Sequence, residues 1–395
     1  MTTNNTKMPK FERAFVRSIY IHVPFCKAKC PYCDFESIPF DAQIYRRYLG
    51  ALEKEMDLYG LVPDADFPVV PDTIYIGGGT PTVPDVDEIE KLLALICARI
   101  DTSDVVEWTV EANPGTITRE KIDLLMRRGV NRISLGVQSF DDKSLASRAL
   151  ARSHSSAHNM EAIEVVKNCG IENFSLDLIY AVPDMTMETW VDSLRRAIDF
   201  GAPHISVYSL SYEDGTPLKR MLDDGSAKKC SEDAELEMYL SAVEMLSEGG
   251  LFRYEVSNFA KAGYESLHNS AYWDYQPVLA LGASASGFLS GRRYNNVRNS
   301  LQYISLLEGA GSPIGYEERL AEKRQAAEVV YLALRRARGI TDADFRRKAG
   351  IGIMELYGEE IERLSRNGLV DYFDSTLRLT DKGFMFADTV MMEFF

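Results

Sequence analysis

The sequence has little of several features that would place it in a specialised class of protein. It has only six cysteines in 395 residues, which is too few for a disulfide scaffold. No stretch approaches the roughly 18 consecutive apolar residues that a membrane-spanning helix needs, and the first residues lack the apolar centre of a secretory signal. These three deficits favour a chain that works in the reducing cytoplasm and has no integral membrane segment.

Positive charge is also in short supply. The chain has 44 lysines and arginines against 59 aspartates and glutamates, so its formal net charge is −15. A surface that wraps a phosphate backbone needs the opposite sign. We therefore expect no nucleic-acid partner, and the length alone suggests about two or three domains.

The chain does have a repeated alternation of short β-rich runs and longer helical patterns. Six such units are expected, with strands at residues 17–23, 73–76, 106–111, 132–137, 174–180 and 204–210. This alternation is typical of an α/β fold with a parallel sheet. Because a full barrel needs eight units, the pattern favours an open, partial (β/α)6 TIM-like barrel. A doubly wound sheet is the alternative.

The pattern changes after the barrel repeat. We expect an N-terminal extension at 1–16, the partial barrel at 17–211, a middle segment at 212–314 and a C-terminal domain at 315–395. In the middle segment, residues 263–299 are rich in Gly, Ser and Asn and are expected to be irregular.

The C-terminal region starts with a long helical pattern at 317–338. Two shorter helices at 342–348 and 353–367 follow, and then two strands at 369–373 and 376–379. This order resembles a winged-helix module. Acidic residues slightly outnumber basic ones here, so a structural or partner-docking α+β domain is expected rather than a DNA reader.

The cysteines are unevenly distributed. Cys26, Cys30 and Cys33 lie within eight positions, just after the first expected strand, whereas the other three are solitary and are expected to be packed thiols. Three closely spaced thiolates can converge on one metal centre. A structural zinc ion would need a fourth ligand, which His22 could supply. An iron–sulfur cubane on three cysteines would instead leave one iron open to a ligand.

Polar or glycine-rich residues stand at successive strand ends beside this cysteine loop. Gly77, Gly78 and Gly79 close the second strand, Glu111 the third and Gln138 the fourth, and Asp177 lies on the fifth. The carboxyl ends of parallel barrel strands meet at one face. The sequence therefore predicts a polar binding site next to the three cysteines.

The cysteine loop Cys26-Lys-Ala-Lys-Cys30-Pro-Tyr-Cys33 and the Gly-Gly-Gly-Thr-Pro turn resemble the radical S-adenosylmethionine (SAM) superfamily. Four further segments resemble its coproporphyrinogen dehydrogenase-like group and, within it, the HemW branch of heme chaperones. They are Tyr-Ile-His-Val-Pro-Phe-Cys, Glu-Ala-Asn-Pro-Gly, Gly-Val-Gln-Ser-Phe and His-Asn-Ser-Ala-Tyr-Trp. The resemblance implies that the oxidases of this group have a fourth cysteine at the position where this sequence has Phe35.

The resemblance implies a role for each matching residue. Cys26, Cys30 and Cys33 would hold a 4Fe-4S cluster whose free iron binds SAM. The other implied contacts are Tyr20, Gly77, Gly78, Gly79 and Thr80 for the methionine part of SAM, Glu111 near its ribose, Gln138, Arg152 and Asp177 for a neighbouring site, and His268 for heme. Arg148 competes with Arg152 for its role, because the segment before Arg152 is longer than expected.

The resemblance implies a heme chaperone that binds heme, a 4Fe-4S cluster and SAM, and delivers heme to apo heme proteins of the respiratory chain. It leaves room for transient contact with membrane proteins. Oxygen-independent oxidation of coproporphyrinogen III is the enzyme alternative, which Phe35 disfavours, and a zinc-bound scaffold without redox chemistry is the third. Whether the chain is an enzyme stays open at this point.

Overall fold

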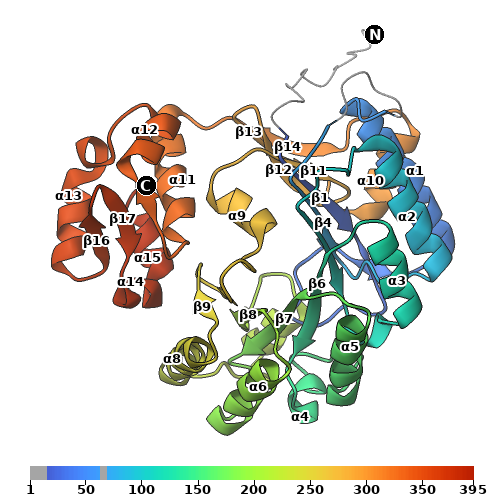
Figure 1. The fold of residues 1–395 in the computed structure, drawn as a ribbon, viewed down its shortest axis with the longest axis horizontal. Helices are drawn as coiled ribbons and strands as arrows, with labels where there is room; N and C mark the ends of the chain where they lie inside the picture. The colour runs from blue at the N-terminus through green and yellow to red at the C-terminus, as the bar shows by residue number, and fades with distance from the viewer. Residues whose placement is uncertain (1–15, 63–68) are drawn as a thin grey trace.

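The computed structural model describes residues 16–62 and 69–395, so the expected N-terminal extension lies outside the described residues except for Val16. Its largest element is a twelve-stranded sheet (Figure 1). Six parallel strands form the centre of this sheet: β1 (Ser18–Val23), β4 (Thr73–Gly78), β5 (Glu107–Ala112), β6 (Arg132–Gln138), β7 (Asn173–Tyr180) and β8 (His204–Ser209). All six agree with the expected strands to within two residues at either end.

The order of these strands decides between the two expected architectures. They lie side by side in chain order, β1-β4-β5-β6-β7-β8, and each pairs in parallel with the next. A doubly wound sheet reverses its strand order near the middle. The doubly wound alternative is therefore wrong, and the expected α/β class with six parallel strands in chain order is confirmed.

Helices cover the outer face of this parallel sheet (Figure 1). They are α1 (Ala42–Leu58), α2 (Val86–Arg99), α3 (Arg119–Arg127), α4 (Asp142–Leu145), α5 (Ser156–Asn168) and α6 (Met187–Asp199), with η2 (Pro114–Thr116) as a short 3-10 turn. Most begin at a side-chain cap; Asp41, for example, accepts hydrogen bonds from two backbone amides of the first turn of α1, which satisfies amides that have no partner inside the helix.

The strands are apolar on one face and polar on the other. On β6, Ile133, Leu135 and Val137 belong to the main hydrophobic core, whereas Arg132 and Ser134 line a cavity on the inner face. Because successive side chains of a strand point to opposite faces, each strand contributes one row to the core under the helices and one row to a polar lumen. The main core therefore lies outside the barrel and not at its centre.

The middle segment is more regular than expected. Residues 263–299 contain α9 (Leu267–Trp273), β11 (Val278–Leu281), β12 (Ser286–Leu289) and β13 (Arg292–Asn296). Strand β11 pairs in parallel with β1 and so adds a seventh parallel strand. The expectation of an irregular segment was wrong because its strands are short and become ordered only by pairing with one another and with the barrel.

Further elements of the middle segment flank the barrel. They are α7 (Pro217–Asp223), α8 (Glu232–Glu248), β9 (Phe252–Arg253), β10 (Asn258–Ala260) and α10 (Ser300–Glu308). Strand β10 pairs antiparallel with β8 and extends the sheet at its other edge. Two short strands flank the cysteine loop, β2 (Phe25–Cys26) at its start and β3 (Ile38–Pro39) after it, and they pair with each other.

The C-terminal domain has its own hydrophobic core. Its elements are α11 (Glu322–Leu334), β15 (Ile340–Thr341), α12 (Asp342–Ala349), α13 (Ile353–Arg366), β16 (Val370–Phe373), β17 (Thr376–Leu379), α14 (Asp381–Met385) and α15 (Ala387–Met392). The order of α11 to β17 is that of a winged helix, with a three-stranded sheet β15-β17-β16.

The start of this domain differs from the expectation. Residues Ile314–Glu318 form β14, which pairs antiparallel with β13 in the large sheet. The helix expected from residue 317 therefore begins later, at Glu322, because strand pairing overrides the local helical pattern. The expected domain boundary at residue 315 falls inside β14.

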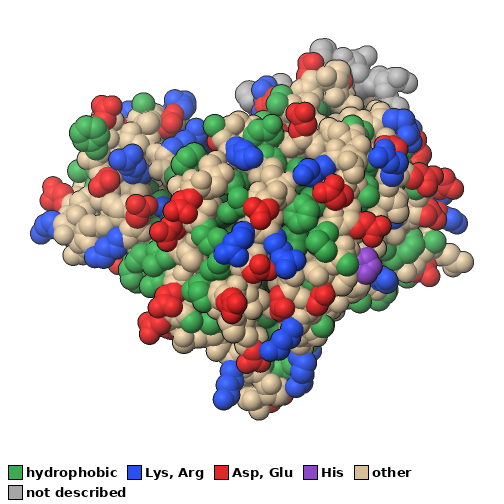
Figure 2. All heavy atoms as spheres, turned by 60° about the horizontal axis from the view of Figure 1, so that its bottom comes forward, with side chains coloured by type: hydrophobic (Ala, Val, Ile, Leu, Met, Phe, Trp, Pro, Cys, Tyr) green, Lys and Arg blue, Asp and Glu red, His purple; other side chains and the backbone are tan. Residues whose placement is uncertain are grey.

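Within the two described ranges, no helix is long and apolar enough to cross a membrane. On the face drawn in Figure 2, basic and acidic side chains are interspersed over most of the surface. That face therefore carries no broad field of a single sign.

Candidate functional site

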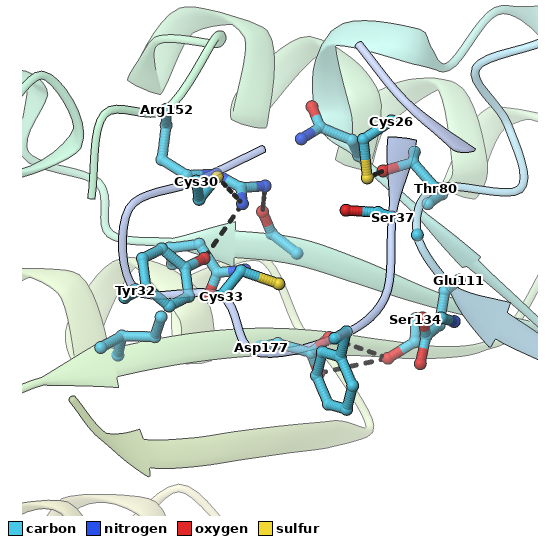
Figure 3. A pocket seen from close by; sticks show the side chains of 18 of the residues that line it. Cys26, Cys30, Tyr32, Cys33, Ser37, Thr80, Glu111, Ser134, Arg152 and Asp177 are labelled. Atoms are coloured by element: carbon cyan, nitrogen blue, oxygen red, sulfur yellow. Dashed lines mark hydrogen bonds between the residues drawn. The ribbon is translucent and has the colours of Figure 1, made fainter. Parts of the chain in front are cut away.

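One cavity of about 580 Å³ opens beside the cysteine loop and continues into the lumen of the barrel. Its walls contain Cys26, Cys30 and Cys33 together with residues from β4 to β8, and Figure 3 shows their side chains around it. The structure thus brings most of the expected site residues to one place. They are Cys26, Cys30, Cys33, Gly78, Gly79, Thr80, Glu111, Gln138, Arg152 and Asp177.

Two contacts fix the conformation of the cysteine loop, one within its backbone and one to Thr80, which follows the three glycines. The amide of Cys33 donates to the carbonyl of Cys30 at 3.1 Å, and the Sγ of Cys26 lies 3.7 Å from the hydroxyl of Thr80. All three thiols are partly exposed. Burial raises the pKa of Cys26 and of Cys33, so ligation by these thiolates would release protons.

Arg152 lies directly at this loop. Its guanidinium donates to the Sγ of Cys30 at 3.3 Å and to the hydroxyl of Tyr32 at 3.0 Å (Figure 3). Arg148 is exposed and does not line the cavity. Of the two competing arginines, Arg152 is the one that meets the cysteine loop, and the sequence reasoning missed its partner Tyr32.

The glycine turn fits against Glu111. The Glu111 carboxylate accepts hydrogen bonds from the hydroxyl of Tyr75 at 2.8 Å and from the amide of Gly78 at 3.0 Å. A Cβ on Gly77 would lie 2.7 Å from the Cδ of Glu111, and Gly78 has a φ of 103°. Only glycine allows this approach and this backbone conformation. Burial raises the pKa of Glu111 to about 7.

Asp177 and Gln138 complete the wall next to Arg152. The Asp177 carboxylate accepts from the hydroxyls of Ser134 and Ser175 at 3.0 and 3.1 Å, and burial raises its pKa. Gln138 ends β6 with a φ of 65°. A positive φ is uncommon for a residue with a side chain and marks a backbone that the surroundings hold in place.

Tyr20 and His22 do not line the cavity. The hydroxyl of Tyr20 pairs with the Nδ1 of His22 at 3.0 Å, and the Nε2 of His22 pairs with the carbonyl of Glu36 at 3.0 Å. Both ring nitrogens are therefore engaged. His22 as the fourth ligand of a zinc ion is wrong in this structure, which removes the ligand that the zinc alternative needed.

His268 does not line the cavity; it lies behind Tyr75, a residue of the cavity wall, and beside Thr73 at the start of β4. It is only 1% exposed, its Nδ1 pairs with the hydroxyl of Thr73 at 2.9 Å, and its ring stacks on Tyr75 with centroids 5.1 Å apart. Its Nε2 is buried and has no hydrogen-bond partner among the described residues. Burial lowers the pKa of His268 to about 3, so the imidazole is neutral.

Helix α9, which carries His268, is held at both ends. At its start, the Glu107 carboxylate accepts from the amides of Leu267 and His268 at 2.9 and 3.0 Å. At its end, the Asp274 carboxylate pairs with Arg336 and Arg338 of the C-terminal domain. The barrel and the C-terminal domain thus fix opposite ends of one short helix, which lies between them in Figure 1.

The sequence reasoning also missed the residues that line the deep end of the cavity. Arg132 and His204 are the first residues of β6 and β8, and both face the lumen. The available signal was the polar residue at every second position of each expected strand. This signal was sufficient to find Arg132 and His204, but the sequence reasoning considered only the carboxyl ends of the strands.

The residues present fit an iron–sulfur cluster better than a single ion. Among the described residues, no three His, Cys, Asp or Glu side chains converge closely enough to hold one metal ion. A four-iron cubane spaces its thiolates more widely than one zinc ion does, and three thiols with an arginine beside them line one cavity here. Where bound, such a cluster with SAM supplies one-electron chemistry.

Comparison with known proteins agrees with this geometry. The model of the radical SAM superfamily matches residues 20–197, and that of the HemN C-terminal domain matches residues 320–386. Among solved structures, the coproporphyrinogen III oxidase HemN from Escherichia coli has a TM-score of 0.83 and 21% identity, and the match covers 97% of this chain and 91% of that one. The chain is a member of the radical SAM superfamily.

Curated relatives narrow the family further. The heme chaperone HemW of Lactococcus lactis is 36% identical over 95% of this chain and 97% of that protein. HemW of Bacillus subtilis is 34% identical over 96% of this chain and 99% of that protein. The chain belongs to the HemW family, whose superfamily implies a 4Fe-4S cluster and SAM as cofactors.

Proposed function

We propose that this protein is a heme chaperone that binds heme at His268 and, at the cysteine end of the lumen, a 4Fe-4S cluster with SAM. The observation that carries the proposal is the unpartnered Nε2 of a buried, neutral imidazole on α9. A neutral imidazole nitrogen is a common axial ligand of heme iron, and a buried polar atom without a partner is costly unless something fills that role.

The geometry sets a condition on this binding. Because His268 is buried and its Nε2 has no exposed surface, we expect heme iron to reach this nitrogen only when α9 moves away from the barrel. Two observations favour this function over coproporphyrinogen oxidation. The chain is similar over nearly its whole length to proteins named heme chaperones. Phe35 also stands in the cavity wall at the position where the oxidases are expected to have a fourth cysteine. The likeness to HemN, at 21% identity, bears on the fold alone.

A titration of the anaerobically reconstituted protein with heme tests the proposal. We expect a Soret shift that saturates near one equivalent, and its loss in His268→Ala. The matched control is His158→Ala, because His158 is an exposed histidine on α5. A wild-type protein that gives no Soret shift and does not co-elute with heme would contradict the proposal.

The enzyme alternative has its own test. Anaerobic incubation with SAM, a reductant and coproporphyrinogen III should leave the porphyrinogen unchanged if the protein is a chaperone only. Formation of protoporphyrinogen would sink that view.

The proposed acceptors are apo heme proteins of the respiratory chain. If heme is handed over in a complex, its transfer to such an apo protein should be faster than its release to a heme scavenger. Equal rates would indicate passive dissociation. We also propose a cytoplasmic location, which the low cysteine content favours and which cell fractionation tests.

A further inference from the structure

Arg132 is a buried charge without a close partner. It is 2% exposed, and it lines the deep end of the cavity at the start of β6. Its Nε is fully buried and unpaired, and no other hydrogen bond or ion pair of its guanidinium is found within the described residues. Buried charges in proteins are normally paired, because removing a charge from water is expensive.

Among the described residues that line the cavity, two carboxyl groups are not exposed, Glu111 and Asp177, and both are already engaged elsewhere. Asp177 accepts from the hydroxyls of Ser134 and Ser175, and Glu111 accepts from Tyr75 and from the amide of Gly78. Burial has the strongest influence on both groups and raises their pKa values. The positive charge of Arg132 lowers the same pKa values, but its influence is weaker. Neither carboxyl therefore neutralises the guanidinium by direct contact.

Among the residues that the structure describes, no second cation lines this end of the cavity. The Nδ1 of His204 pairs with the hydroxyl of Ser175 at 2.7 Å, and its Nε2 pairs with the hydroxyl of Tyr254 at 2.9 Å. Burial lowers the pKa values of His204 and His268, so both rings are neutral. The deep end thus offers one fixed positive charge in neutral, polar surroundings.

The cavity is long enough to bind different ligand groups at its two ends. From Arg132 to Gln138 the strand advances six residues, or about 20 Å, and residues at both ends of this run line the same cavity. SAM is expected at the glycine turn, next to the cysteines, so the carboxylate of its methionine part belongs to that end. A carboxylate at the deep end must come from another ligand.

We propose that Arg132 binds a carboxylate and that this carboxylate is a propionate of the heme carried by this protein. The inference rests on the proposed heme-binding function and adds to it the group that orients the ligand. A guanidinium can donate two parallel hydrogen bonds to one carboxylate. Arg132 is in register with Tyr75, one strand away across Thr109 of β5, and the ring of Tyr75 stacks on His268.

The test uses the full-length, reconstituted protein and two probes, heme and heme dimethyl ester, which lacks free carboxylates. Wild-type protein should bind heme about 10- to 100-fold more tightly than the ester, as expected for a hydrogen bond to a charged group. Arg132→Met should bind both probes with equal affinity. Arg132→Lys keeps the charge without the paired donors and should lie between them.

Controls separate this inference from folding and from SAM binding. Arg148→Met removes an exposed arginine and should behave as wild type, and the cluster absorbance near 400 nm reports whether each variant is loaded. If wild type binds heme and the ester equally, or if Arg132→Met still prefers heme, the inference is overturned while the heme function stands. If Arg132→Met loses SAM binding but keeps the wild-type preference for heme over the ester, the carboxylate at Arg132 belongs to SAM, and the inference is overturned as well. A wild type that binds neither probe removes both proposals.

Discussion

The two ends of the lumen are built in different ways. At the cysteine end, Cys26, Cys30 and Cys33 are partly exposed on a loop, and glycines leave the backbone bare. At the deep end, His268 is sealed by ring stacking, a hydrogen bond to Thr73 and a helix fixed at both ends. The cysteine end can accept a ligand as it stands, whereas His268 becomes accessible only when α9 moves. Cluster loading and heme binding should therefore respond to different substitutions.

The largest expected effect is at the cysteine end. Cys30→Ala removes one of the three thiols and one of the hydrogen-bond partners of Arg152, so the absorbance near 400 nm of the reconstituted protein should be lost almost completely. Heme binding at His268 should persist, because that residue does not line the cavity wall formed by the cysteines. Cys97→Ala, at a solitary cysteine, is the control. Simultaneous loss of heme binding in Cys30→Ala would mean that the two ends are not independent.

The next effect is at the deep end. Glu107→Gln removes the charge that accepts from Leu267 and His268 at the start of α9, and should cost about 2 kcal/mol in the free energy of unfolding. Amides of residues 266–273 should exchange with solvent faster, and heme should bind faster, since α9 is released more readily. Glu53→Gln, at an exposed carboxylate on α1, is the control. A variant with unchanged amide exchange would show that Glu107 does not hold this end closed.

The pH dependence should also differ between the ends. Burial raises the pKa of Glu111 to about 7, so this carboxyl becomes ionised as the pH rises from 6 to 8. The family resemblance implies that Glu111 lies near the ribose of SAM, where an ionised carboxylate would accept a ribose hydroxyl and attract the positive sulfonium more strongly. SAM affinity should therefore rise by about tenfold over this range, and Glu111→Gln should abolish the rise. An equal rise in Glu111→Gln would assign it to another group.

Ionisation of Glu111 should lower the free energy of unfolding as the pH rises, whereas it should raise the affinity for SAM. The folded pKa of Glu111 is raised above its ordinary value, so the folded state holds a proton that the unfolded state has already released. Stability is highest below the unfolded pKa and falls as the pH rises to about 7, by at most about 3 kcal/mol. Urea unfolding of wild type and Glu111→Gln at pH 5 and pH 8 measures this difference.

The smallest effect is expected at Phe35. Its ring is 67% exposed at the cavity wall, so Phe35→Ala should change the free energy of unfolding by no more than about 0.5 kcal/mol. Cluster absorbance should also stay at the wild-type level, in contrast to Cys30→Ala. A large loss of either would show that the cysteine end depends on packing that its exposure does not suggest.

Sequence reasoning succeeded where local pattern and motif agreed. The six parallel strands have strong apolar periodicity, and motifs led to the expectation that Cys30, Glu111 and Asp177 meet in one place, as they do in the cavity wall. It failed where pairing partners decide the structure. Residues 263–299 become β11 to β13 only through neighbours distant in sequence, and β14 forms because it pairs with β13.

Arg132 and His204 illustrate a different kind of failure. Both stand at the first position of a strand, where attention to carboxyl ends does not reach. That His22 is already engaged by Tyr20 and Glu36 could not be foreseen either, because hydrogen-bond partners of a buried ring depend on packing in three dimensions.

The outward placement of the core has an evolutionary consequence. Because residues such as Ile133 and Leu135 pack under the helices and not in the lumen, the fold draws most of its apolar stabilisation from side chains that do not face the ligands. The inner wall can therefore change one residue at a time while the protein stays folded. An ancestral barrel of this kind could acquire a new ligand without first acquiring a new scaffold.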